Sequence, residues 1–272
     1  MVSPDSVAVH QRSSNERHQV TKCVVLIASL GSSFIRFRKA LIEEFLADGL
    51  RVVCIGPEPE PRTKVELVAL GVEYRKVCFS RRSLTPVQEL VCLVQLFWIL
   101  KQLQPTLLLA YTPKPVILGS IAGAIARVPR RYALITGLGF IFSDQRPRFV
   151  FQRFLLKLGY RISLRLNPIV FFQNQQDVGV LRENGALGKA TPSVIVPGSG
   201  VDLESFKFVP YESDLKRFVF IGRLLKSKGV IDFVAAANRI ASQHPEVSFE
   251  VVGSPDSDHP DRVPSKVLEQ WQ

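Results

Sequence analysis

The stretch that decides the fold reads FVFIGRLLKSKGV and spans residues 218–230. Its first four residues are apolar, Gly222 permits a tight turn, and apolar side chains then recur at helical spacing. The pattern predicts a strand, a turn and a helix. In parallel α/β sheets, ligands bind at the carboxyl ends of strands, and a helix start favours an anion. Arg223 and Lys228 are therefore candidate phosphate-binding residues, and the alternative is two solvated cations beside an ordinary turn.

The same alternation of strand and helix runs through the chain from residue 22 onward. Strands separated by helices of this length predict an α/β fold with a parallel sheet covered on both faces. The expected strands are 23–28, 51–56, 72–77, 106–110, 131–135, 167–173, 193–196, 218–221 and 247–252. The expected helices are 34–48, one ending near 70, then 85–102, 116–126, 146–166, 177–183, 230–242 and one starting at 265.

Three segments follow from this pattern and from the linker signals. Residues 1–20 are polar and are expected to be a loose N-terminal extension. Residues 21–210 are expected to form a Rossmann-like domain that ends in a linker rich in glycine and proline. Residues 211–272 hold only two expected strands and are interpreted as the beginning of a second Rossmann-like domain.

The composition is that of a globular protein with an excess of positive charge. Hydrophobic residues make up 46% of the 272 residues, and the formal net charge is +11. That charge suggests an acidic partner, such as nucleic acid, anionic lipid or a phosphorylated substrate. Charge is the only feature that favours nucleic acid, because basic and aromatic residues are not interleaved in a binding motif, so we expect no nucleic-acid partner.

The cysteines and the hydropathy pattern favour the cytoplasm. Cys23, Cys54, Cys78 and Cys92 are far apart in apolar surroundings, which predicts buried, reduced thiols. No apolar run reaches the length of about 18 to 20 residues needed to span a bilayer. The histidines show no metal-ligand spacing, and the Asp256–Asp258 pair lies in a polar loop, so we expect no metal.

Residues 146–166 differ in their pattern of charge from the other expected helices. Cations recur every fourth residue among aromatic and aliphatic side chains, which predicts a cationic amphipathic helix. Such a helix suits the surface of an anionic membrane, and the alternative is a core-packing helix with a solvated basic face. The candidate membrane-facing residues are Arg153, Lys157, Arg161 and Arg165.

Four motifs, in this order and spacing, resemble those of glycosyltransferase family 4 enzymes with the two-domain GT-B fold. The resemblance runs from about residue 22 to the last residue, and it is most similar to the branch that extends polyprenyl-diphosphate-linked glycans or surface-polysaccharide precursors. The motifs are 31–34 with Arg36 and Arg38; 111–115; 136–140; and 197–202 leading into Gly222, Arg223 and Lys228.

The resemblance implies a nucleotide sugar, typically a UDP-sugar, as donor and co-substrate, with no cofactor. It implies that Gly222, Arg223 and Lys228 hold the donor diphosphate, that no metal is needed, and that transfer retains the anomeric configuration. The general base is not identified, because no histidine lies between His18 and His244. The implied acceptor-side residues are Gly31, Ser32, Ser33, Arg36, Arg38, Lys114, Gly137 and Gly139.

The resemblance also raises an expectation about activity. Family members carry a Glu-x7-Glu element deep in the second domain, and residues 211–272 contain no such element. We therefore expect a truncated, impaired enzyme that is cytoplasmic or peripheral on the inner face of the plasma membrane. The alternative is a non-catalytic, membrane-docking acceptor subunit with a separate catalytic partner. A dehydrogenase is disfavoured because LGSS at 30–33 replaces the glycine fingerprint after the first strand.

Overall fold

The computed structural model of the protein describes residues 22–79, 86–138, 150–210, 216–255 and 261–271. The backbone divides into two compact units, the first ending at Asp202 and the second beginning at Leu203. The predicted extension 1–20, Gly139 and the Asp256–Asp258 pair lie outside the described residues.

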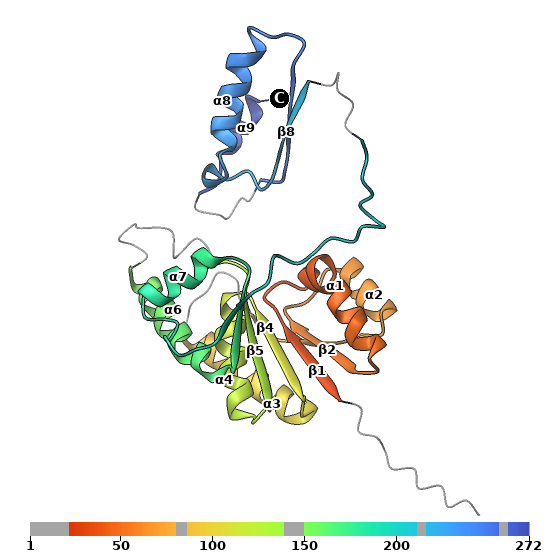
Figure 1. Ribbon diagram of the computed structural model, residues 1–272, viewed down its shortest axis with the longest axis vertical. Helices are drawn as coiled ribbons and strands as arrows, with labels where there is room; N and C mark the ends of the chain where they lie inside the picture. The colour runs from red at the N-terminus through yellow and green to blue at the C-terminus, as the bar shows by residue number, and fades with distance from the viewer. Residues whose placement is uncertain (1–21, 80–85, 139–149, 211–215, 256–260, 272) are drawn as a thin grey trace, which may run out of the picture. The chain divides into compact units, whose positions relative to one another are not determined.

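The first unit is built on a parallel sheet with strand order β3-β2-β1-β4-β5-β6-β7 (Figure 1). Every neighbouring pair in this order is parallel. The order reverses between β1 and β4, which makes this pair the topological switch point of the sheet. The strands are β1 (Cys23–Ile27), β2 (Arg51–Gly56), β3 (Glu73–Lys76), β4 (Leu107–Tyr111), β5 (Arg130–Ile135), β6 (Ile169–Phe172) and β7 (Ser193–Ile195).

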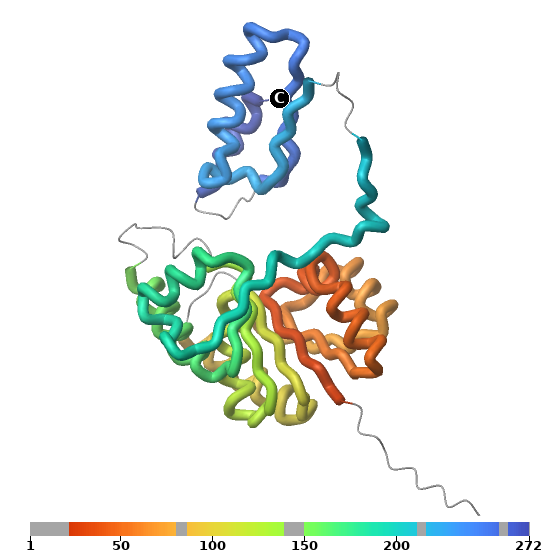
Figure 2. Tube along the Cα trace, in the orientation of Figure 1, coloured from red at the N-terminus to blue at the C-terminus, as the bar shows by residue number. Residues whose placement is uncertain are grey.

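Helices cover both faces of this sheet. One apolar layer joins the sheet to α1 and α2, and a second layer joins the other face to α3, α4, α6 and α7. Figure 2 shows α1 and α2 to one side of the strands and α4 and α6 to the other. The helices are α1 (Ser32–Ala47), α2 (Pro61–Ala69), α3 (Pro86–Leu103), α4 (Pro113–Ile125), α6 (Val150–Ser163) and α7 (Gln175–Glu183), with a 3₁₀ turn η2 (Leu164–Leu166) after α6.

The predicted α/β architecture is confirmed, and element boundaries differ by a few residues. The strand predicted at 51–56 has those bounds in the structure, whereas α4 begins at Pro113 rather than at the predicted residue 116. Proline fits the first turn of a helix because its missing N–H would have no partner there. The earlier start places Lys114 in the first turn of α4.

One prediction about the cysteines is wrong. Cys23, Cys54 and Cys92 are buried, but Cys78 is exposed. Cys78 directly follows Val77, which is buried, and it lies just beyond the edge strand β3. Successive side chains of an extended segment point in opposite directions, so burial of Val77 leaves its neighbour outside.

The second unit contains a parallel pair of strands, β8 (Arg217–Ile221) and β9 (Ser248–Val252). Its described helices are η3 (Lys226–Lys228), α8 (Val230–Ala241) and α9 (Ser265–Glu269). The buried cluster of this unit contains Leu224, Val230 and Val263. Two strands cannot enclose a core, and the apolar side chains of Phe218 and Ile221 on β8 are accordingly exposed.

Candidate functional site

The loops that leave the sheet at its switch point are joined to each other. The hydroxyl oxygens of Ser29, after β1, and Thr112, after β4, are 2.9 Å apart. The backbone N–H of Ser29 also donates to the Thr112 hydroxyl, at 3.3 Å. Because ligands of open α/β sheets bind at this point, the two loops define the candidate site of the first unit.

Thr112 has an unusual backbone conformation for its residue type. Its φ is 71°, although it is β-branched and immediately precedes α4. A β-branched residue at positive φ is strained, by roughly 1–3 kcal/mol, and such strain concentrates at functional sites. The two hydrogen bonds between Ser29 and Thr112 hold this conformation and thereby fix the start of α4, where Lys114 lies.

On the α1 side of the sheet, a polar cluster forms around Tyr111. The Ser33 hydroxyl donates to the Leu30 carbonyl at 2.5 Å and therefore accepts from the Tyr111 hydroxyl at 2.9 Å. Burial raises the pKa of Tyr111, so this phenol remains a donor. The Arg38 guanidinium lies 4.9 Å from the centre of the Tyr111 ring, in cation–π contact.

Arg38 is a buried cation, with 6% of its surface exposed. Its Nη1 donates to the Phe37 carbonyl and to the Ser199 hydroxyl, the latter at 2.8 Å. Gln173 donates to the same hydroxyl at 3.2 Å. Burial lowers the pKa of Arg38 from its ordinary value. The hydrogen bond to Ser199 thus links α1 to the segment that follows β7.

Lys114 points to the other side of the sheet. Its Nζ is 2.5 Å from Oε1 of Glu89 on α3, and 14% of the lysine side chain is exposed. Lys114 and Arg38 were predicted on the same acceptor side, and the structure places them against different helices. The switch-point residues therefore form two groups, one with α1 and one with α3 and α4.

The remaining predicted acceptor-side residues have different surroundings. Gly31 is buried, and a Cβ atom there would lie 2.9 Å from Cβ of Pro59, so packing requires glycine. Ser32 is also buried, whereas Arg36 is exposed. Gly137, after β5, has φ 145°, a conformation that favours glycine. The roles of these residues in acceptor binding stay predictions.

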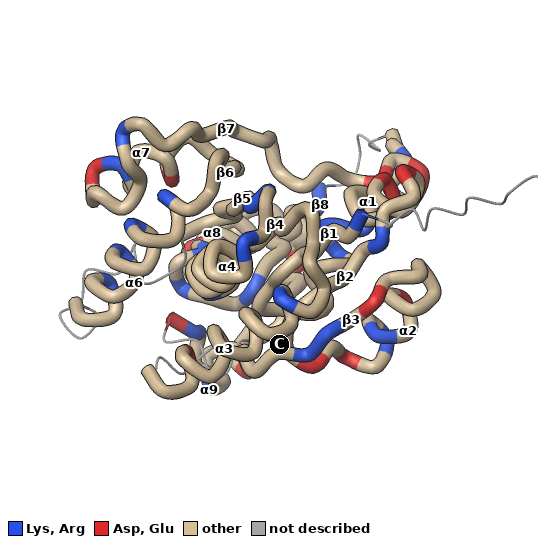
Figure 3. The backbone as a smooth tube through the Cα atoms, turned by 90° about the horizontal axis from the view of Figure 1, so that it is seen from below, with Lys and Arg blue, Asp and Glu red and all other residues tan. Residues whose placement is uncertain are grey.

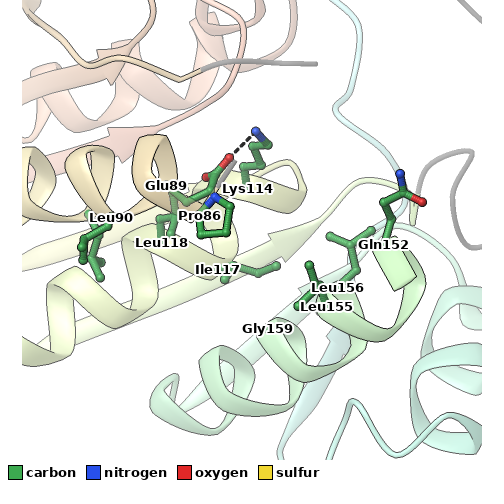
Figure 4. A pocket seen from close by; sticks show the side chains of 11 residues that line it. Pro86, Glu89, Leu90, Lys114, Ile117, Leu118, Gln152, Leu155, Leu156 and Gly159 are labelled. Carbon is green, nitrogen blue, oxygen red and sulfur yellow. Dashed lines mark hydrogen bonds and ion pairs between the residues drawn. The ribbon is translucent and has the colours of Figure 1, made fainter. Parts of the chain in front are cut away.

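A cavity of about 370 Å³ lies between α3, α4 and α6. Apolar side chains form most of its wall, and the Lys114–Glu89 ion pair lies at one end (Figure 4). This cavity was not predicted from the sequence, because its walls come from three helices that are distant in the chain. The available signal was the exposed apolar stripe of α3, whose large members are Val87, Leu90, Val91, Val94 and Trp98.

The amphipathic helix α6 exposes much of its apolar side. Leu156, Tyr160 and Ser163 are buried against the core, whereas Phe151 is 68% exposed, and Phe154, Leu158 and Ile162 are also exposed. Basic segments recur along α6 in Figure 3. Arg153 and Lys157 are half-buried, Arg161 is exposed, and Arg165 is exposed in η2. Among the described helices, none has the length and apolar character that a membrane span requires.

The predicted donor site lies in the turn between β8 and α8. Arg223 and Lys228 are exposed, and Lys228 belongs to η3 rather than to α8. The backbone N–H of Ser227 donates to Oδ2 of Asp261 at 2.8 Å, so a carboxylate already occupies one amide of this turn. Gly229 follows with φ 78° and precedes α8.

Gly222 is less constrained than its place after β8 suggests. A Cβ atom on Gly222 would make only ordinary contacts, at 3.6 Å from the Phe220 ring. Packing instead requires a glycine at Gly253, after β9, because a Cβ atom there would lie 1.9 Å from the Gly222 carbonyl oxygen. Gly253 was not among the residues predicted from the sequence, because this contact joins the ends of two strands.

The sequence model of the family described as "Glycosyl transferase 4-like" matches residues 23–174, which is more than half of the chain. The chain belongs to this family. The match contains β1, β4, the switch-point loops and α6. It ends before the second unit begins, so it carries no information about Arg223 or Lys228.

A protein from Campylobacter jejuni is 26% identical to this chain over 243 residues. It is named N,N'-diacetylbacillosaminyl-diphospho-undecaprenol alpha-1,3-N-acetylgalactosaminyltransferase. The alignment covers 85% of this chain and 63% of that protein. The chain therefore spans less than two thirds of the length of this relative.

Solved structures share the fold at low sequence identity. Anabaena HepE, in complex with UDP and glucose, has a TM-score of 0.61 and 17% identity, with 91% of this chain and 65% of that chain covered. UDP-GlcNAc 2-epimerase from Neisseria meningitidis, bound to UDP-GlcNAc, has a TM-score of 0.58 and 12% identity, with 92% and 68% covered. The fold is thus the GT-B fold, and because an epimerase shares it, the fold alone does not determine the reaction.

Proposed function

We propose that this protein is a glycosyltransferase that moves a sugar from a UDP-sugar to a polyprenyl-diphosphate-linked glycan or a related polysaccharide precursor. The observation that carries the proposal is the family match over residues 23–174, which contains the switch-point site. The Campylobacter relative supports the acceptor class, since its name includes diphospho-undecaprenol. HepE, which was solved with UDP and glucose, supports the donor class.

In this proposal the first unit binds the acceptor. Lys114 supplies a positive charge in the first turn of α4, where the helix dipole also favours an anion. An acceptor diphosphate would compete with Glu89 for this lysine. Gly31, Ser32, Ser33 and Arg36 would contact the acceptor from the α1 side of the switch point, and Gly137 would contact it from the loop after β5. A role for Gly139 stays a prediction from the sequence.

The second unit would bind the donor diphosphate. Arg223 can fork onto two phosphate oxygens, and Lys228 adds a second positive charge from η3. Positive charge at this place stabilises the negative charge that develops on the leaving diphosphate as the glycosidic bond breaks. Transfer would retain the anomeric configuration and need no metal ion.

An assay of the purified protein tests this function. The protein would be incubated with a panel of radiolabelled UDP-sugars and an undecaprenyl-diphosphate-linked monosaccharide, and lipid-extractable label would be measured. We expect labelled lipid with at least one donor, unchanged by EDTA, and loss of most activity in Arg223→Ala. Epimerisation of the nucleotide sugar without transfer would contradict the proposal. It would indicate a reaction like that of the structurally similar UDP-GlcNAc 2-epimerase.

A second candidate function is a non-catalytic, membrane-docking acceptor subunit. The described second unit favours it, because only Leu224, Val230 and Val263 form its buried cluster. Equilibrium binding separates the two functions. The transferase would bind a UDP-sugar and lose that binding in Arg223→Ala. The subunit would bind the lipid-linked acceptor but no UDP-sugar, and it would transfer no sugar without a partner protein.

We also propose that α6 docks the protein on an anionic membrane as a peripheral protein of the cytoplasmic side. The exposed aromatic side chains of α6 lie on the same helix as its cations, as in helices that lie in a membrane interface. Flotation with vesicles that contain phosphatidylglycerol should show binding that weakens as salt rises.

A matched pair of charge reversals tests the docking face. Arg161→Glu with Arg165→Glu should abolish flotation. Arg62→Glu with Lys64→Glu changes the charge equally on α2, which covers the other face of the sheet, and should preserve it. Equal loss in both pairs would show that net charge alone drives binding.

A further inference from the structure

The cavity between α3, α4 and α6 combines an apolar wall with a charged end. Leu93 of α3, Ile117 and Leu118 of α4, and Leu155 and Leu156 of α6 contribute the apolar wall. Its volume, about 370 Å³, lies within the range of small-molecule sites, roughly 300–1,000 Å³. A ligand that fills this space must present a hydrocarbon surface.

The charged end of the cavity is formed by Lys114 and Glu89. Figure 4 shows this ion pair beside Pro86 and Leu118, at the start of α4. Lys114 and the first turn of α4 favour an anion, and Glu89 is a competing carboxylate that an anionic ligand would replace. The complete site therefore matches a molecule with an anionic head and an apolar chain.

The cavity is continuous with apolar surface. Leu90 lines the cavity and is 60% exposed, and it belongs to the exposed apolar stripe of α3. On α6, Leu155 lines the cavity next to Phe154, which is exposed. A chain longer than the cavity could thus leave it along exposed apolar side chains, with the cations of α6 nearby.

We propose that this cavity binds the isoprenoid units next to the diphosphate of a polyprenyl diphosphate, with Lys114 contacting the diphosphate. This assignment rests on the proposed function, and it adds a subsite for the lipid to it. The charge at the mouth favours this occupant over an uncharged apolar ligand. The exposed apolar residues on both flanking helices favour a chain that continues into a bilayer.

Photolabelling locates the site. Farnesyl diphosphate with a diazirine on its terminal isoprene would be irradiated with the protein, and labelled peptides would be mapped by mass spectrometry. We expect label in α3 and α6, and competition by unlabelled farnesyl diphosphate but not by inorganic diphosphate at equal concentration. Label in α1 or α2 would overturn the assignment.

Variants test the cavity itself. Leu155→Trp fills it and should weaken farnesyl diphosphate binding roughly tenfold while leaving inorganic diphosphate binding unchanged. Leu41→Trp is the matched control, because Leu41 is half-buried on α1 against the other face of the sheet. Circular dichroism and thermal unfolding check that both variants fold. Equal farnesyl diphosphate binding by wild type and Leu155→Trp would contradict the proposal.

Glu89→Gln gives an independent result that does not depend on added bulk. Glu89→Gln removes the carboxylate that competes with the ligand for Lys114, so binding of farnesyl diphosphate should become tighter by several-fold. If the cavity instead holds a helix of a second copy, Leu90→Asp would convert a dimer into a monomer in size-exclusion chromatography, and the lipid assignment would fall.

The lipid subsite and the proposed function would be disproved by different results. Equal KM values for farnesyl-linked and short alkyl-linked diphosphate acceptors would remove the subsite and leave the transferase function intact. Labelling of α3 and α6 with no sugar transfer to any acceptor would keep the lipid site and remove the proposed function.

Discussion

The two faces of the seven-stranded sheet use their cations differently. On the face of α1 and α2, Arg38 is buried in contact with Tyr111 and Ser199. Its guanidinium links α1 to β4 and to the segment after β7. On the face of α3, α4 and α6, Lys114 lies beside an apolar cavity, and α6 places cations beside exposed aromatic side chains. Two cations near one switch point, Arg38 and Lys114, thus serve packing on one face and, in our proposal, lipid recognition on the other.

The largest effect on stability is expected at Arg38. Arg38→Ala removes its hydrogen bond to Ser199 and the packing of its side chain, and should lower the free energy of unfolding by about 3 kcal/mol. Arg36→Ala, on the same helix but exposed, should change it by less than about 0.5 kcal/mol. Urea denaturation measures both, and similar values for the two variants would break the comparison between buried and exposed cations.

Gly31 should be the next most sensitive position. A Cβ atom in Gly31→Ala would meet Pro59 at 2.9 Å, which should cost about 2 kcal/mol. Gly179→Ala, inside α7 with open space around it, should instead stabilise by about 0.5–1 kcal/mol. Melting temperatures that move in the same direction for both variants would refute the packing role of Gly31.

The hydrogen bond between Ser33 and Tyr111 should contribute a smaller, pairwise effect. Ser33→Ala, Tyr111→Phe and the double variant form a cycle in which we expect a coupling free energy of about 1 kcal/mol. Additive free energies of unfolding would mean that the two hydroxyls act independently.

The smallest effect on stability is expected on the cavity face. Phe154 is exposed on α6, so Phe154→Ser should change the free energy of unfolding by less than about 0.5 kcal/mol. The same variant should reduce flotation with anionic vesicles, because an apolar membrane contact is lost. If Phe154→Ser strongly lowered the free energy of unfolding and left flotation unchanged, α6 would have a purely structural role.

The sequence predicted the fold well because strand and helix periodicities are local signals. The strand at 51–56 was predicted with its observed bounds, and the parallel alternation from residue 22 onward is confirmed. The start of α4 was predicted three residues late, because its first turn begins on Pro113 and is less apolar than the rest of the helix.

The candidate site was predicted only in part, because its decisive contacts join distant residues. Periodicity alone could not separate Lys114 from Arg38, since their helices pack on opposite faces of the sheet. The positive φ of Thr112 depends on Ser29, which lies 83 residues earlier in the chain. The exposed thiol of Cys78 likewise follows from its position beyond an edge strand rather than from its apolar neighbours in sequence.

Hydrogen–deuterium exchange with farnesyl diphosphate tests most directly which face recognises the lipid-linked acceptor. We expect slower exchange at the start of α4 and along α6, with exchange in α1 and α2 unchanged. Leu155→Trp should remove this protection, and Leu41→Trp should retain it. Protection confined to α1, with none on α6, would contradict recognition of the lipid by the face of α3, α4 and α6.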